Sequence, residues 1–208
     1  MGFFKIKFTP RISVKYFLNH CLRLNRRPCM VLILTSRLSL REFTLEDYEG
    51  VHAFASDPEV CQFTVWGPNT PDDTRSFLKK ALNEQVENPR LRCNFVVVHP
   101  SYGVIGSCGI NVNSLEHRST SISYFLNKSY WGMGYGTEIA RRLISYGFEE
   151  LNMYRITATC DPRNIASWKI MEKNGMKREG LLRHNQMIRG EWRDSYIYSI
   201  LLLEYRTE

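Results

Sequence analysis

Alternating hydrophobic and polar positions divide the first part of the chain into a strand, two helices and a loop. Residues 37–43 alternate between the two kinds of side chain, which predicts a strand. Residues 44–56 begin with an N-capping threonine and continue with apolar residues at helical spacing. The glycine and proline content of residues 63–73 predicts a loop. A second helix is expected to open at Asp72 or Asp73, with its apolar positions at Phe77, Leu78, Ala81, Leu82 and Val86.

The middle of the chain has a different pattern, with three β-rich runs joined by short turns. These runs are residues 93–100, 103–113 and 119–127, and their spacing predicts a meander of antiparallel strands. One face of a helix follows, marked by Ile139, Ala140, Leu143, Ile144, Gly147, Phe148 and Leu151.

The last part of the chain predicts a strand, a helix and a hairpin. The strand covers residues 154–160, and the helix is expected to begin with Asp161 as N-cap and Pro162 at its first position and to stop at Gly175. Residues 181–205 predict a hairpin that turns at Arg189-Gly190. No internal repeat or linker is visible, so the pattern predicts one α+β domain.

Composition agrees with one globular domain, and the distribution of charge argues against a nucleic-acid binder. The chain has 208 residues, 43% of them hydrophobic, and a formal net charge of +7. Residues 1–30 hold seven Lys or Arg and no acidic residue, so the 21 basic and 21 acidic residues of 31–208 cancel. Because the excess charge lies in the first 30 residues, a basic face on the domain is not expected.

We expect residues 1–30 to form a poorly ordered basic extension and residues 31–208 to form the domain. Charges interrupt the extension throughout, so it lacks the apolar core of a secretory signal. Its lack of acids would suit an organellar presequence, although it is not rich in serine, and its first six residues do not match the myristoylation pattern.

Cysteines and hydropathy predict a cytoplasmic protein without a metal or a membrane segment. The six cysteines form no C-x-x-C pair and no metal-binding spacing, which is typical of a reducing compartment. The apolar run at residues 30–34 is long enough for one strand and far shorter than the roughly 18 residues of a membrane helix.

The first motif with chemical content places Gly132, Gly134 and Gly136 between the strand 119–126 and a helix. The first turn of a helix leaves N–H groups without partners, and glycines allow an anion to approach them, so a phosphate-bearing ligand is expected. A purely structural role in tight packing is the alternative. A dinucleotide fingerprint with Asp161 on the ribose fits less well, because five residues separate the strand from the glycines. No Gly-Lys-Ser/Thr follows, which excludes a P-loop.

The second motif is residues 161–176, in which Asn164 and Ser167 share a face of the expected helix. An Asn and a Ser at this place are more often caps than catalysts. If the strand before this helix pairs in parallel, the helix lies on the same side of the sheet as the glycine-led helix.

The two motifs together resemble the GNAT superfamily of acyl-CoA N-acyltransferases, and more narrowly the branch of ribosomal-protein N-terminal alanine acetyltransferases. Residues 122–176 carry both motifs in order and spacing, residues 35–51 are typical of the first strand and helix of that branch, and the resemblance covers about residues 33–205. It implies a twisted, mixed, mostly antiparallel sheet with helices on both faces and a splay between its fourth and fifth strands.

The resemblance also implies roles for particular residues. Main-chain N–H groups from Gly132 through Thr137 would hold the pyrophosphate of acetyl-CoA, and backbone at Phe125 and Leu126 would pair with the pantetheine arm and polarise the thioester carbonyl. Asn164 would contact the pantetheine, and Ser167 would protonate the departing thiolate. The implied cofactor-binding set is Phe125, Leu126, Gly132, Met133, Gly134, Tyr135, Gly136, Thr137 and Asn164.

The resemblance implies direct acetyl transfer to a primary amine, with no metal and no covalent enzyme intermediate. The acceptor would be a protein N-terminus or a small amine such as a polyamine, an aminoglycoside or an amino-acid-like metabolite, and the enzyme would be a monomer or homodimer. Ser121 and Ser123 stand where many members carry a carboxylate and a glycine, so no general base is assigned. The loop 62–73, with Trp66, is expected to form part of the acceptor wall, and Glu138 is expected to be structural. An acyl-CoA-binding sensor without catalysis is the alternative from another class.

Overall fold

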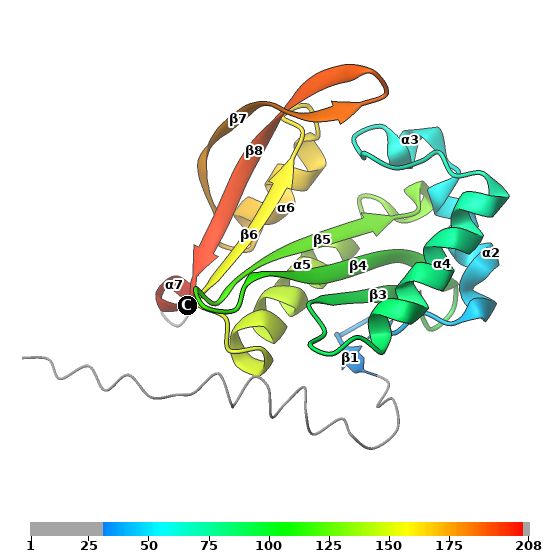
Figure 1. The fold of residues 1–208 in the computed structure, drawn as a ribbon, viewed down its shortest axis with the longest axis horizontal. Coiled ribbons are helices and arrows are strands. Elements are labelled where there is room, and N and C mark those ends of the chain that lie inside the picture. Colours follow the sequence, from blue (N-terminus) through cyan, green and yellow to red (C-terminus); the bar gives the residue numbers. More distant parts are fainter. Residues whose placement is uncertain (1–30, 206–208) are drawn as a thin grey trace, which may run out of the picture.

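The computed structural model describes residues 31–205, so the expected extension at residues 1–30 lies outside the described residues. Eight strands form one twisted sheet in the order β1-β2-β3-β4-β5-β6-β8-β7 (Figure 1). The strands are β1 (Leu32–Leu34), β2 (Ser39–Arg41), β3 (Arg92–His99), β4 (Gly103–Ser114), β5 (Ser119–Leu126), β6 (Arg155–Cys160), β7 (Lys177–Ile188) and β8 (Glu191–Leu201). All neighbouring strands are antiparallel except β5 and β6, which pair in parallel. The predicted mixed, mostly antiparallel sheet is therefore confirmed.

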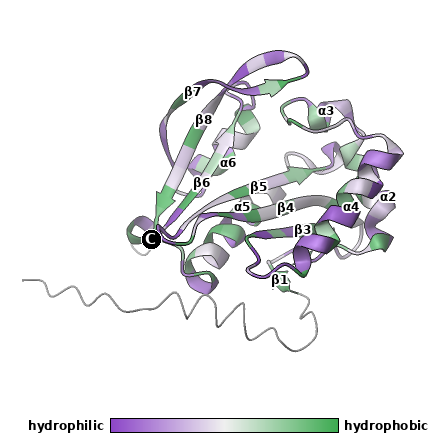
Figure 2. Ribbon diagram, viewed as in Figure 1, coloured by the Kyte–Doolittle hydropathy of each residue, from purple (hydrophilic) through white to green (hydrophobic). Residues whose placement is uncertain are grey.

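Helices cover both faces of the sheet, as expected for this α+β fold (Figure 1). The main core lies between the sheet and the two helices α5 and α6, and a smaller core lies under α2 and α4. Figure 2 shows hydrophilic turns on the outward side of α4, whose inner side buries Leu78 and Ala81. The helices are α2 (Tyr48–Ala55), α3 (Pro58–Cys61), α4 (Pro71–Gln85), α5 (Tyr135–Ser145), α6 (Ile165–Lys173) and α7 (Leu202–Tyr205), with 3-10 turns at Leu45–Asp47 and Lys128–Tyr130 and a π turn at Tyr146–Glu150.

Two predicted helix starts are wrong, and hydrogen bonding explains each difference. Helix α4 opens at Pro71 rather than Asp72 or Asp73, because Thr70 caps it by accepting from the Asp73 N–H. Helix α6 opens at Ile165, with Asn164 rather than Asp161 as its cap. The Asp161 carboxylate accepts from Arg163 instead, so residues 161–164 form a turn before the helix. The expected single helix through Leu151 widens into the π turn after Ser145.

The splay expected between the fourth and fifth strands occurs between β5 and β6, which are the predicted fourth and fifth strands because the short β1 adds one strand at the start of the sheet. The two strands pair at only three positions, from Ser119↔Arg155 to Ser121↔Thr157, although β5 continues to Leu126. Beyond Ser121 the two strands separate, which leaves one edge of β5 without a neighbouring strand. This gap places a cleft at the centre of the sheet.

The hairpin of β7 and β8 turns at Arg189-Gly190, as predicted, with both residues at positive φ. Its tip reaches the loop after α3, where the Arg189 guanidinium donates hydrogen bonds of 2.8 Å to the main-chain oxygens of Cys61 and Gly67. Figure 1 shows the hairpin and the α3 region facing each other across the splayed sheet. The hairpin therefore closes the second side of the cleft.

Candidate functional site

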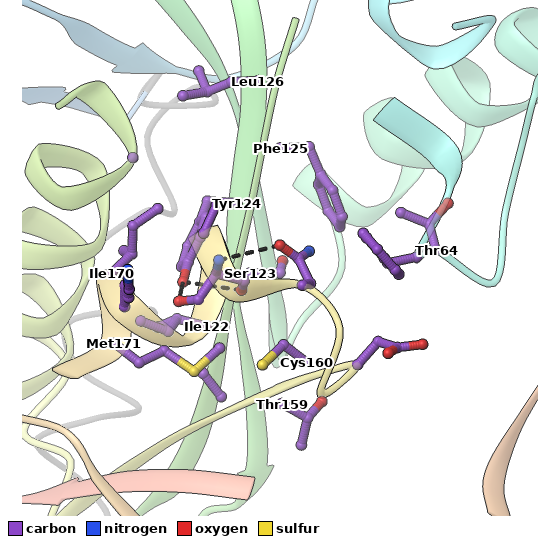
Figure 3. A pocket seen from close by; sticks show the side chains of 18 of the residues that line it. Thr64, Ile122, Ser123, Tyr124, Phe125, Leu126, Thr159, Cys160, Ile170 and Met171 are labelled. Carbon is purple, nitrogen blue, oxygen red and sulfur yellow. Dashed lines mark hydrogen bonds between the residues drawn. The ribbon is translucent and has the colours of Figure 1, made fainter. Parts of the chain in front are cut away.

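A cavity of about 790 Å³ occupies the gap between β5 and β6. Its walls come from the second half of β5, the start of α5, the end of β6, the first turns of α6 and the loop around Thr64. Figure 3 shows that consecutive β5 residues point to opposite sides, Tyr124 toward Ile170 of α6 and Phe125 toward Thr64. The cleft therefore passes through the sheet, and β5 presents different side chains to its two halves.

The predicted site residues lie together in this cleft, with one exception. Phe125, Leu126, Gly132, Gly134, Tyr135, Gly136, Thr137, Asn164 and Ser167 all line it. Met133 does not, because its side chain is half exposed to solvent and its main-chain oxygen accepts a 3.0 Å hydrogen bond from Arg37. Trp66, expected in the acceptor wall, also lines the cleft.

The three glycines around the start of α5 have two different structural roles. Gly132 and Gly134 adopt φ of +76° and +81°, a region that residues with a Cβ rarely occupy. Gly136 lies inside the helix, where a Cβ would come within 2.7 Å of the Ile170 side chain. The first two glycines shape the loop, and the third allows α5 to pack closely on α6.

The start of α5 directs main-chain donors at the cleft. The first intrahelical hydrogen bond joins the Glu138 N–H to the Gly134 oxygen at 3.1 Å. The N–H groups of Tyr135, Gly136 and Thr137 therefore have no acceptor within the helix, and the helix dipole adds partial positive charge there. These donors, together with an open loop at Gly132, suit the pyrophosphate of a nucleotide-like ligand.

Glu138 anchors this loop to the first strands. One of its carboxylate oxygens accepts from the Thr35 and Ser36 hydroxyls and the Arg37 N–H, and the other accepts from the Arg37 guanidinium at 2.7 Å. Burial alone would raise the pKa of Glu138, but these donors outweigh it and lower the pKa to about 2. Arg37 also bonds the Met133 oxygen, so the expected structural role of Glu138 extends to the glycine loop.

Asn164, Ser167 and Tyr124 meet midway along the cleft. The Asn164 side chain caps α6 by accepting from the Ser167 N–H at 3.1 Å, and the Ser167 hydroxyl remains directed at the cleft. The Tyr124 hydroxyl donates to the Ser167 main-chain oxygen at 3.2 Å and lies 3.4 Å from the Ser167 hydroxyl. Burial raises the pKa of Tyr124 well above its usual range, against the opposing effect of Ser167, so its proton is retained at neutral pH.

Tyr124 is the site residue that sequence reasoning did not single out. It belongs to the predicted strand, and the alternation of side chains places it on the face of Ile122 and Leu126. That alternation was the available signal, but the pairing with Ser167 depends on how α6 crosses the gap in the sheet.

Cys160 and Asp161 line the cleft where β6 ends. Burial raises the pKa of Cys160 to about 11, against the opposing effect of Ser167, which keeps the sulfur as a thiol at neutral pH. Burial would also raise the pKa of Asp161, but hydrogen bonds from Arg163 outweigh this and lower it. Arg193 of the hairpin lies 3.8 Å from the same carboxylate, so Asp161 is a neutralised structural anion.

Two further observations concern metals and membranes. Within residues 31–205, no group of three or more His, Cys, Asp or Glu side chains is arranged to hold a metal ion. In the same range, no helix has the length and hydrophobicity needed to cross a bilayer.

Comparison with known proteins identifies the family. The sequence model of the acetyltransferase (GNAT) domain matches residues 37–177. The uncharacterized N-acetyltransferase YnaD of Bacillus subtilis (strain 168) is 34% identical over 173 residues, which cover 83% of this chain and 98% of that protein. A spermidine N(1)-acetyltransferase of Escherichia coli (strain K12) is 30% identical over 92 residues, 44% of this chain and 50% of that protein.

A solved structure agrees with the sequence matches. The crystal structure of a GNAT-family acetyltransferase from Bacillus anthracis superposes with a TM-score of 0.73 at 34% identity, covering 83% of this chain and 99% of that one. The cleft between splayed strands thus belongs to an N-acetyltransferase fold. The chain belongs to the GNAT family of N-acetyltransferases, as its two motifs suggested.

Proposed function

We propose that this N-acetyltransferase moves an acetyl group from acetyl-CoA directly to a primary amine, with a protein N-terminus as the preferred acceptor class. The observation that carries the proposal is the cleft through the splayed sheet, with unpaired main-chain donors at one end and Ser167 at its middle. The arrangement supports a donor that enters from the α5 side and an amine that enters from the side of the hairpin.

The glycine loop supports the donor half of the proposal. The N–H groups at the start of α5 bind the pyrophosphate, and the exposed edge of β5 at Phe125 and Leu126 accommodates the pantetheine arm. Part of that edge is already engaged, because the Leu126 oxygen accepts from the Trp131 indole at 2.8 Å. Asn164, held as the cap of α6, presents its remaining amide surface to the same arm.

Ser167 supports the chemical step. The neutral amine nitrogen attacks the thioester carbon and forms a tetrahedral intermediate, and the carbon–sulfur bond breaks as Ser167 protonates the departing thiolate. The proton that the nitrogen loses returns to the Ser167 oxygen, directly or through water, so the products are the amide, the free CoA thiol and the unchanged serine. Tyr124 positions Ser167 by donating to its main-chain oxygen, and the two hydroxyls lie 3.4 Å apart. The Cys160 thiol, with its raised pKa, is poorly suited to covalent catalysis, which favours direct transfer.

The charges around the cleft favour an acceptor with one positive charge. Two carboxylates line the cleft, Glu59 and Asp161, and each already has a cationic partner. Lys128 contacts Glu59 at 2.8 Å, and Arg163 contacts Asp161 at 2.6 Å. A polyamine carries several charges that need acidic partners, whereas a protein N-terminus brings a single ammonium group that becomes neutral before it attacks.

Small amines are the second candidate class, and the partial match to a spermidine N(1)-acetyltransferase is the observation that favours them. They share the chemistry of the proposed reaction and differ only in what surrounds the amine. A direct comparison of acceptors therefore separates the two classes.

Two measurements test the proposal. Calorimetric titration of acetyl-CoA into the full chain should show binding at micromolar concentrations, and its absence would remove the donor half. A thiol-release assay should then compare N-terminal peptides, small monoamines, spermidine and aminoglycosides at equal concentration. Faster release with peptides or monoamines supports the acceptor class, a clear preference for spermidine contradicts it, and binding without release from any amine would indicate a sensor instead of an enzyme.

A further inference from the structure

A second cavity lies beside the cleft, on the opposite face of the sheet from α5 and α6. It has a volume of about 440 Å³ and is enclosed by α2, α4 and the sheet. Most of its wall is apolar, and the main contributors are Phe43, Val51, Phe54, Ala55 and Phe77. An engineered cavity of about 150 Å³ with a similar lining is large enough to bind benzene, so this one could hold an aromatic group.

The second cavity and the cleft share part of their walls. Both are lined by Ser123 and Phe125 of β5 and by Trp66 of the loop between α3 and α4. The rings of Trp66 and Phe125 meet edge to face at 5.1 Å, with an interplanar angle of 78°. This aromatic pair therefore forms the partition between the cavity and the cleft.

The cavity is formally almost neutral, which restricts what it can hold. Its one carboxylate, Asp73, is exposed and accepts from the Thr70 N–H and hydroxyl as part of the helix cap. Asn94 donates its amide to Glu84 on α4 at 2.8 Å. The other polar residues of the lining, Asn69, Ser107 and Ser123, are uncharged, so the wall offers no free charge to a second ammonium or carboxylate of a substrate.

We propose that this cavity is a specificity pocket that takes a neutral, aromatic or branched aliphatic group attached close to the acceptor amine. The inference rests on the proposed acetyl transfer and adds the chemistry of the acceptor side chain. The amine stands in the cleft near Ser167, and the attached group passes the Trp66–Phe125 partition into the apolar cavity. The acceptor is thus a primary amine with a bulky apolar substituent.

The position of the cavity favours the acceptor over a long acyl chain as its occupant. The donor approaches along the α5 face, where the glycine loop lies, and Tyr124 and Leu126 point to that face of β5. Ser123 and Phe125 alternate with them and point to the α2 and α4 face, which the hairpin and the loop around Trp66 border. The cavity continues from this second half of the cleft.

The test compares two amines that differ only by a ring, ethylamine and 2-phenylethylamine. With acetyl-CoA as donor, we expect kcat/KM to be at least about tenfold higher for 2-phenylethylamine, because its ring leaves water for an apolar site. Peptides that are identical except for an N-terminal Ala or Phe should show the same order. Equal values for both pairs would overturn the proposal.

Two variants fill the cavity from different helices. Phe77→Trp on α4 and Ala55→Leu on α2 should each lower the ratio of kcat/KM for 2-phenylethylamine to that for ethylamine from about tenfold or more toward one. Val86→Trp is the matched control, because Val86 is 73% exposed at the end of α4 and outside both cavities. A preference that survives both filling variants, each shown to bind acetyl-CoA normally, contradicts the proposal.

Two further measurements test whether the cavity holds the acyl chain of the donor instead, and whether the pocket exists even if the proposed transfer fails. If butyryl-CoA or phenylacetyl-CoA outperforms acetyl-CoA and the filling variants abolish that advantage, the cavity holds the acyl chain and the proposal is wrong. If acetyl-CoA releases no thiol with any amine, the proposed transfer itself fails. Calorimetric titration of 2-phenylethylamine in the presence of CoA then tests independently whether the cavity binds the apolar group. Binding that is lost in Phe77→Trp then supports the pocket, and no binding to the unmodified chain overturns it.

Discussion

The hydroxyl of Tyr124 on β5 lies 3.4 Å from the hydroxyl of Ser167 on α6 and donates to the main-chain oxygen of Ser167 at 3.2 Å. The two residues come from elements on either side of the splay, so their contact bridges the gap that holds the cleft. We therefore propose different roles for the two hydroxyls: Ser167 donates the proton, and Tyr124 positions Ser167.

Ser167→Ala should lower kcat and leave the affinity for acetyl-CoA unchanged. The substitution removes the proposed proton donor, a loss of roughly 10²- to 10⁴-fold for a general acid, but retains the N–H that Asn164 caps. Steady-state kinetics and calorimetry measure the two effects separately. An unchanged kcat would exclude Ser167 from the catalytic role.

Tyr124→Phe should lower kcat less than Ser167→Ala, by roughly tenfold, because it removes a positioning hydrogen bond and leaves the Ser167 hydroxyl in place. The double variant should be no slower than Ser167→Ala alone, since both changes act on one step. A larger loss in Tyr124→Phe than in Ser167→Ala would identify Tyr124 as the proton donor. Tyr102→Phe is the control, because Tyr102 is exposed and outside the cleft.

Gly134→Glu should weaken acetyl-CoA binding by about a hundredfold or more, because it places a carboxylate where the donors of α5 point at the pyrophosphate. Gly134→Ala is the matched variant, since it imposes the same strain at φ +81°, about 1–2 kcal/mol, without the charge. Calorimetric titration of acetyl-CoA into both variants separates electrostatic repulsion of the pyrophosphate from backbone strain at residue 134. Equal losses of affinity would mean that the charge is irrelevant and that the pyrophosphate lies elsewhere.

Glu138→Gln should lower the free energy of unfolding at neutral pH by about 1–3 kcal/mol, because the Thr35, Ser36 and Arg37 donors lose a charged acceptor. The pKa of Glu138 is lowered from 4.5 to about 2 on folding, so its contribution is complete above about pH 4.5 and is lost as the pH falls toward 2.

Urea unfolding of the wild type and the Glu138→Gln variant at pH 7, 5 and 3 measures this dependence. The difference in stability between the two proteins should shrink as the pH falls, and a constant difference would contradict the assigned charge. Glu150→Gln serves as the control, because the exposed Arg142–Glu150 pair should contribute less than about 1 kcal/mol.

The amino-acid sequence alone predicted most of the fold and most of the cleft. Its hydrophobic periodicity predicted the three-strand meander, the helix after the glycines and the final hairpin, because each depends on side chains close together in the chain. Of the ten site residues predicted from the two motifs and from the family resemblance that they carry, nine line the cleft, and Met133 is the exception. The start of α6 was misplaced, since Asp161 could cap a helix but is bound by Arg163 and lies near Arg193, which is distant in sequence.

The tertiary structure decided what lies across the gap from each motif. Tyr124 reaches Ser167 because β5 and β6 pair only as far as Ser121. Phe125 meets Trp66 because the loop before α4 folds over the opposite face of the same strand. Local sequence determines which face of a strand or helix a side chain occupies, but contacts between elements depend on long-range packing. The proposed donor site therefore follows largely from local sequence, whereas the proposed acceptor pocket is formed by residues that only the folded chain brings together.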